Sequence, residues 1–310
     1  MLNLIRNENM KTYRRFRTWI MVLLLIGIVG FGAYQINHFR PDPANWKQES
    51  AETIKNYKSA LNDNPSMQNR NYFEERIKLE EYRLEHDLIP PDNTLWGSVL
   101  DMSDLIVLVT IFTVVVAADS VAGEFTQGTV KMLLIRPHSR NKVLLSKYLS
   151  SLLFSLFLLI VLFGASYGFG GLFSGFDSAS LPHLSVGSDG AVHESNMIVH
   201  TLSIYGLSCV NLLMTVTLAF MISTLFRSNS LAIALSIVVL LLSNTAIHLL
   251  KGYSWIKYYL FANTDLTQYL NDAPLRDDMT LTFSILVLVG YFIVMNLLTW
   301  TLFKKRDVAA

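Results

Sequence analysis

The chain has 310 residues, of which 52% are hydrophobic and only 16% are charged, whereas ordinary soluble domains carry about 25% charged residues. This composition argues against a soluble enzyme and predicts an integral membrane protein. A net charge of +1 provides no overall field for nucleic acid, so we expect no nucleic-acid partner. The single cysteine, Cys209, excludes an intramolecular disulfide and a cysteine-based metal site.

Six apolar stretches meet or approach the roughly 20 residues that a helix needs to cross the hydrocarbon core of a bilayer. They are Trp19–Ile36, Leu100–Ala118, Tyr148–Phe173, Leu202–Leu225, Leu231–Leu250 and Leu281–Phe303. Asp101 and Asp104 open the second stretch, and the cost of a carboxylate at the bilayer centre places both near the outer interface. We therefore predict an all-α integral membrane protein with six transmembrane helices, the first over residues 18–38.

Lysine and arginine indicate the orientation, because cytoplasmic segments retain them. Basic residues gather before the first stretch, between the second and third, at Arg227 between the fourth and fifth, and after the sixth. Both termini are thus expected in the cytoplasm, with the chain in a bacterial cytoplasmic membrane. A cleaved signal peptide is the alternative for the first stretch, but its length and the lack of an Ala-x-Ala site argue against cleavage.

Two segments outside these stretches are expected to be helical. Residues 1–17 are basic with apolar residues interspersed, which predicts an N-terminal interfacial helix; a solvated basic tail is the alternative. Residues 39–98 have a soluble composition and predict an external helical hairpin of Asn45–Asn62 and Met67–His86. Within it, Glu74 and Lys78 form an expected i,i+4 ion pair.

Two further external segments separate the later stretches. Gly164–Gly190 is rich in glycine and serine, and because its glycines follow no strand it lacks the context of a phosphate-binding loop. We expect a flexible loop there. In the external segment 251–279, residues Gly252–Asn271 alternate aromatic with polar side chains, which favours short helices in the outer leaflet.

No motif for enzymatic chemistry is present. The chain has no Walker sequence, no His-Glu-x-x-His and no Gly-x-Ser-x-Gly, so we predict no catalytic residue and no metal ligand. His200, His248 and Asp119 lie near the ends of the apolar stretches, whereas a proton-coupled transporter usually carries ionisable groups deep in the membrane. Any driving force for transport would therefore come from another protein.

The internal segment 119–147 is the most informative part of the chain. It contains, in order, Glu124, Gly128-Thr129, a short apolar run, Pro137, Ser139-Arg140 and Lys147. This order resembles the cytoplasmic segment of type-2 ABC exporter permeases, the family with bacterial drug, bacitracin-immunity and sodium-extrusion members. The ending from Phe303 to Val308 resembles that of the same family, so the similarity covers essentially the whole chain.

The resemblance implies a permease subunit that works with separate P-loop ATPase subunits and a second permease subunit, identical or homologous, in the lipid bilayer. This chain would bind no cofactor itself, and ATP and Mg would sit on the partner ATPase. The resemblance also implies ATPase-coupling residues within 119–147. They are Glu124, Phe125, Thr126, Gln127, Gly128, Thr129, Arg136 and Arg140.

A physical interpretation of this segment is a short amphipathic helix from Gly123 to Leu134 that ends before Pro137. Phe125 and Leu133 would enter a cleft of the ATPase, while the Glu124 carboxylate would meet a basic group there. The alternative is an ordinary loop, shaped by its glycines, in which Glu124 is solvated.

Polar side chains within the apolar stretches give two alternatives. They could line a cargo path, or they could form hydrogen bonds between packed helices. The candidates for the cargo path are Thr110, Thr113, Asn211, Thr215 and Asn244. Cys209 is expected to be a buried packing residue.

We thus interpret the chain as the permease subunit of an ATP-binding-cassette exporter with an amphiphilic or peptide-like cargo. A polytopic membrane sensor or anchor, whose external hairpin binds a ligand, is the alternative. A secondary transporter is disfavoured by the missing intramembrane charges.

Overall fold

The computed structural model describes residues 1–39, 45–63, 70–91, 94–128, 139–176, 181–187, 190–226, 228–270 and 274–305. The helices and strands, in chain order, are α1 (Leu2–Tyr13), α2 (Phe16–His38), α3 (Trp46–Asp63), α4 (Arg70–His86), α5 (Leu95–Asp101), η2 (Met102–Leu105), α6 (Ile106–Thr126), α8 (Arg140–Ser174), β1 (Pro182–Val186), β2 (Val192–Asn196), α9 (Met197–Leu225), α10 (Asn229–Leu250), η3 (Ser254–Tyr258), α11 (Leu260–Thr264), η4 (Leu266–Tyr269) and α12 (Leu281–Lys305).

Six membrane-spanning helices are confirmed. The spans are α2, the continuous run from α5 through η2 to α6, α8, α9, α10 and α12. Helices α10 and α12 expose several large hydrophobic side chains on their outer faces, for example Leu241 and Leu286. Lipid tails are as apolar as leucine, so these faces suit contact with a bilayer.

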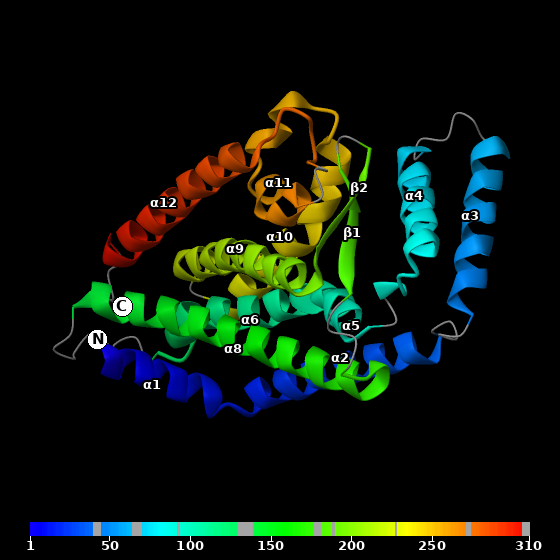
Figure 1. Cartoon of the computed structure of the whole chain (residues 1–310). Coiled ribbons are helices and arrows are strands. Elements are labelled where there is room, and N and C mark those ends of the chain that lie inside the picture. The colour runs from blue at the N-terminus through cyan, green and yellow to red at the C-terminus, as the bar shows by residue number, and fades with distance from the viewer. Residues whose placement is uncertain are drawn as a thin grey trace.

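The main core lies where α8 and α6 meet α2 and α9 (Figure 1). Leu25 and Val29 of α2, Val109 of α6 and Leu158 of α8 are fully buried in it. The first apolar stretch therefore packs as one helix of the bundle. In a membrane such packing stabilises the association of the helices through close van der Waals contact rather than through the removal of water.

Small residues let α6 approach α9 closely. Ala118 and Ala122 of α6 are fully buried. Ser223 of α9 donates to the carbonyl of Ala118 at 2.5 Å and accepts from the backbone N–H of Ala122 at 3.0 Å. A larger side chain at these alanines would separate the two helices and break this contact.

The start of α1 and the end of α12 lie at one end of the bundle, opposite the α3–α4 hairpin (Figure 1). Arg140, at the start of α8, donates to the carbonyl of Lys304 in the last turn of α12 at 3.4 Å. Helix α1 packs against α8 at the same end. We call this region, with α1, the start of α8 and the end of α12, the basic end.

The helical hairpin expected between the first two spans is confirmed as α3 and α4. Ile54 and Ile77 are buried between them, and the rings of Tyr57 and Phe73 meet edge to face at 5.2 Å. The expected Glu74–Lys78 pair is wrong. Glu74 instead pairs with Arg70 at 2.7 Å, because Lys78 reaches away to donate to the carbonyl of Gly190 at 3.0 Å.

Beyond the predicted third span, which ends at Phe173, the expected flexible loop is wrong in its described part, because residues 182–186 form a strand. Helix α8 continues to Ser174 and ends at Gly175, whose φ of +80° suits glycine. Strands β1 and β2 then form an antiparallel pair, with Pro182 opposite Asn196 and Val186 opposite Val192. Leu184 of β1 is buried. The strand pair contacts α4, where the Tyr82 hydroxyl donates to Glu194 of β2 at 3.2 Å.

Short helices are present in the segment 251–279, as the sequence predicted. Asn263 of α11 is fully buried. Its amide donates to the carbonyls of Lys257 and Tyr259, and its oxygen accepts from Ser284 of α12 at 2.8 Å. These bonds fix the segment to the start of the last membrane helix.

Candidate functional site

A closed ring of four charged side chains joins three helices at the basic end. Lys147 of α8 donates to Glu124 of α6 at 2.5 Å and to Glu8 of α1 at 2.7 Å. Lys11 of α1 donates to the same two carboxylates, to Glu8 at 2.7 Å and to Glu124 at 3.1 Å. Among these four described side chains, two ammonium groups thus alternate with two carboxylates.

The local sequence explains how these side chains come together. Glu8 and Lys11 are three residues apart on α1 and so share one face of that helix. Lys147 lies between Leu144 and Tyr148 in the buried face of α8, which leaves its side chain only 3% exposed. A buried ammonium group requires paired anions, and Glu8 and Glu124 supply them.

The ring changes the acidity of its two α1 members. Burial alone raises the pKa of Glu8, but the positive charges of Lys147 and Lys11 outweigh it and hold this pKa below its ordinary value. Burial alone lowers the pKa of Lys11, but Glu8 and Glu124 outweigh it and raise this pKa. Glu8 and Lys11 are therefore expected to carry their full charges at neutral pH.

A second ion cluster lies on α6 five residues before Glu124. Asp119 is 3% exposed, and its Oδ2 accepts from Arg15, which directly precedes α2, and from Arg17 in the first turn of α2. The same N-terminal segment thus holds the end of α6 at two points. Asp119 lies near the end of its span, as expected.

The structure brings several of the expected ATPase-coupling residues to this ring. Glu124, Phe125 and Thr126 form the last turn of α6, and Gln127 and Gly128 follow directly. Arg140 begins α8. Thr129 and Arg136 lie outside the described residues.

The expected amphipathic helix beginning at Gly123 is wrong in its described part. Gly123–Thr126 continue the membrane helix α6 without a break, because no helix-ending residue precedes them. Gly128 then turns the chain with a φ of +69°. Leu133 and Pro137 lie outside the described residues.

The alternative in which Glu124 is solvated is wrong, since its side chain is only 15% exposed. Among the described residues its carboxylate accepts from Lys147 and Lys11 of its own chain. Its expected contact with a basic group of an ATPase stays a prediction. Phe125 packs beside Tyr148 and Phe220. Sequence reasoning singled out neither Glu8 nor Lys11; the only local signal was their i,i+3 spacing on a predicted helix.

The expected cargo-path residues divide into two groups. Thr110, Thr113 and Thr215 each donate to the carbonyl four residues earlier in their own helix. The hydrogen bonds of these three hydroxyl groups therefore lie within helices rather than between them. Asn211 of α9 and Asn244 of α10 instead line a cavity.

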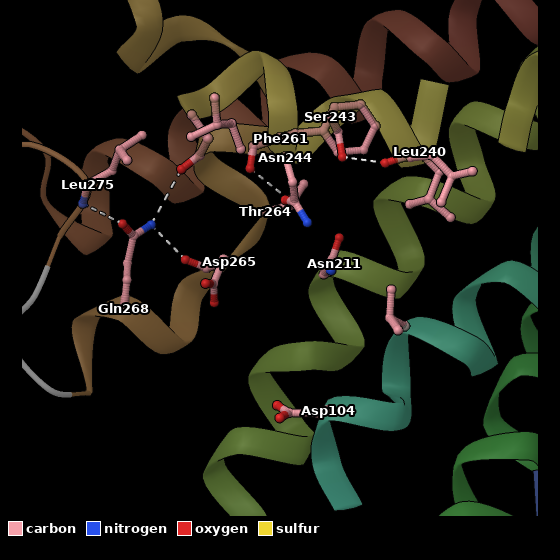
Figure 2. A pocket seen from close by; sticks show the side chains of 14 residues that line it. Asp104, Asn211, Leu240, Ser243, Asn244, Phe261, Thr264, Asp265, Gln268 and Leu275 are labelled. Atoms are coloured by element: carbon pink, nitrogen blue, oxygen red, sulfur yellow. Dashed lines mark hydrogen bonds between the residues drawn. The ribbon is translucent and has the colours of Figure 1, made fainter. Parts of the chain in front are cut away.

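This cavity has a volume of about 510 Å³ and lies between α9, α10, the start of the second span and the segment from α11 to η4. Figure 2 shows the amides of Asn211 and Asn244 facing one another. The wall also carries the carboxylates of Asp104 and Asp265, and apolar side chains including Leu240 and Ile247. None of the described residues that line it is basic.

Two other expectations concern single residues. Cys209 is exposed on the surface of α9, so the expectation that it is buried is wrong; its thiol donates to the carbonyl of Tyr205 at 3.3 Å. Among the described residues, no three histidine, cysteine, aspartate or glutamate side chains gather in a way that suits a metal ion.

These helices and their charged basic end define a multi-pass, all-α membrane protein. Residues 76–309 match the family described as "Protein of unknown function (DUF2705)", and the chain belongs to this family. It is 43% identical over its whole length to the whole of "Uncharacterized protein YhcI" of Bacillus subtilis. It is also 32% identical, over 70% of this chain and 85% of the relative, to "Uncharacterized membrane protein YdbK" of the same organism.

Proposed function

We propose that this chain is the membrane-spanning permease subunit of an ATP-binding-cassette exporter in a bacterial cytoplasmic membrane. In this proposal the basic end faces the cytoplasm, and separate P-loop ATPase subunits bind ATP and Mg there. A second permease subunit completes the membrane channel. The chain itself is not an enzyme.

The observation that carries the proposal is the ring of Glu8, Lys11, Glu124 and Lys147. It lies at the end of α6 and the start of α8 and therefore flanks the segment that resembles the ATPase-contacting part of exporter permeases. A segment fixed at both ends to membrane helices transmits a push from a soluble partner to those helices. A segment whose ends were not attached to the helices would move by itself and would not displace them.

The cavity beside Asn211 and Asn244 is the cargo site in this proposal. Amide groups in membrane helices are costly next to lipid, and a cargo with polar groups would satisfy them. Asp104 and Asp265 make the wall negative, so the cargo would carry positive charge beside its apolar part. Asp104→Asn should therefore weaken binding of a fluorescent cationic amphiphile several-fold, and Glu52→Gln, on exposed α3, should not.

The test of the proposed function is recovery of a partner. The full-length tagged chain, purified in mild detergent from the bacterium that encodes it, should carry a P-loop ATPase that mass spectrometry identifies. Gly128→Val should reduce this recovery without reducing the amount of chain in the membrane. Intact recovery of the chain without any P-loop ATPase would contradict the proposal.

That negative result would favour a membrane sensor. One observation supports this second candidate: Glu194, which accepts from Tyr82 of α4, lies two residues before Asn196, and the Asn196 side chain caps the start of α9. A ligand on the α3–α4 hairpin would thus act directly on a membrane helix. Binding-dependent protection of α9 from hydrogen exchange would distinguish this role.

A further inference from the structure

A second cavity, of about 400 Å³, lies at the basic end beside the ring. It is lined by Arg15, Phe16, Arg17, Asp119, Gln127 and Asn229. These residues belong to the start of α2, the end of α6 and the start of α10. The ends of membrane helices lie at the depth of the lipid headgroups, so the cavity opens where headgroups are present.

The charge of the cavity wall favours an anion. Arg15 and Arg17 both donate to one oxygen of Asp119. Asp119 is the only carboxylate that lines the cavity in the described part of the chain. One positive charge therefore remains in excess at the site.

Two residues of the wall each carry a buried polar atom that has no hydrogen-bond partner among the residues that the structure describes. These atoms are the Nε of Arg17, which is a donor, and the Oδ1 of Asn229, which is an acceptor. A buried polar group without a partner costs free energy. A ligand that satisfies both must present an acceptor to Arg17 and a donor to Asn229.

The third feature of the wall is apolar. Phe16 is 80% exposed, although it begins a membrane helix. An aromatic ring there suits contact with the acyl chains of a bound lipid. A phosphate diester free in solution has no group that uses this ring.

We propose that this cavity binds the headgroup of an anionic phospholipid that carries hydroxyl donors, of the phosphatidylglycerol class. The phosphate accepts from Arg17 Nε and takes up the excess positive charge. A hydroxyl of the headgroup donates to Asn229 Oδ1. The site is independent of any transport role, because it requires only that the basic end meets a bilayer.

The experiment is native mass spectrometry of the full-length chain in detergent, titrated with single lipids. Phosphatidylglycerol should bind several-fold more tightly than phosphatidylmethanol, an anionic diester whose headgroup has no donor. Arg17→Gln should weaken binding of both lipids about tenfold. Asn229→Ala touches no ion pair, and it should reduce the affinity for phosphatidylglycerol to that for phosphatidylmethanol.

Arg14→Gln is the matched control. Arg14 is exposed on the same segment and does not line the cavity, so this variant should bind like the wild type. Equal losses for Arg14→Gln and Arg17→Gln would show surface charge alone and overturn the site. Displacement of the lipid by an equal concentration of soluble glycerophosphoglycerol would show that the ligand is the free diester and overturn the lipid assignment.

Discussion

Replacing Lys147 by methionine tests the ring most directly. The substitution keeps the length of a side chain that is 3% exposed and removes its contacts at 2.5 Å and 2.7 Å to Glu124 and Glu8. Of the described ring members, Lys11, which is 42% exposed, would then be the cation that the two largely buried carboxylates share. Removing one partner from a buried ion pair costs about 3–5 kcal/mol, because the remaining charge stays buried without compensation.

Glu124→Gln should cost less, although it changes the same contact. The amide oxygen still accepts a hydrogen bond, and Lys147 keeps its ion pair with Glu8. Losing the charge from one such hydrogen bond costs about 1–2 kcal/mol. The double variant Lys147→Met with Glu124→Gln should be more stable than the sum of the single losses predicts, since it buries one carboxylate fewer.

The assay is thermal unfolding of the full-length chain in detergent, followed by tryptophan fluorescence. With a shift of about 2–4 °C per kcal/mol, Lys147→Met should lower Tm by about 10 °C and Glu124→Gln by about 4 °C. Lys142→Met is the control, because Lys142 is exposed in the first turn of α8 and should change Tm little. Equal shifts for Lys142→Met and Lys147→Met, or strictly additive losses in the double variant, would refute the reasoning.

Gly128→Val should lower Tm, because a positive φ costs a residue with a side chain about 1–2 kcal/mol; Gly128→Asn, which tolerates this conformation better, should stay near the wild type. Burial and the neighbouring His200 lower the pKa of His183 from 6.5 to about 4. Below pH 6.5 the unfolded segment therefore takes up a proton that the folded one does not. The protection factors of the β1 amides, which are corrected for the intrinsic pH dependence of exchange, should thus fall as the pH falls toward 4, and His183→Gln should remove this dependence. In intact cells lacking the native cysteine, an impermeant thiol reagent should label a cysteine placed at Glu52 and leave one at Ser139 unlabelled; the reverse pattern would invert the proposed topology.

The membrane helices were predictable because their cause is local. A stretch of apolar residues long enough to cross the hydrocarbon core must satisfy its backbone hydrogen bonds internally, and a helix does so. The hairpin helices were equally predictable from the sequence. Helix α3, Trp46–Asp63, differs from the expected Asn45–Asn62 by one residue at each end. Both predictions depend on composition and periodicity over a short window.

The ring was not predictable because its members are far apart along the chain. Lys11 and Glu124 are separated by 113 residues, and Glu8 and Lys147 by 139. Each charge alone is compatible with a solvated surface residue. The β1–β2 pair was missed for a related reason. Four of the five residues of β2 are polar, so the strand has no apolar alternation, and its pairing with β1 and its contact with α4 determine its structure instead.

The N-terminal segment emerges as a structural part of the bundle rather than a basic tail that only sets topology. Tyr13 packs edge to face on Phe157 of α8 at 5.4 Å, and Ser150 of α8 donates to Asn9 at 2.6 Å. Through the ring and the Asp119 cluster the same segment holds the last turns of α6. A movement of the connection between α6 and α8 must therefore either break these ion pairs or carry α1 with it. Breaking buried pairs is costly, so α1 and the α2 helix that follows it are the elements that such a movement would displace first.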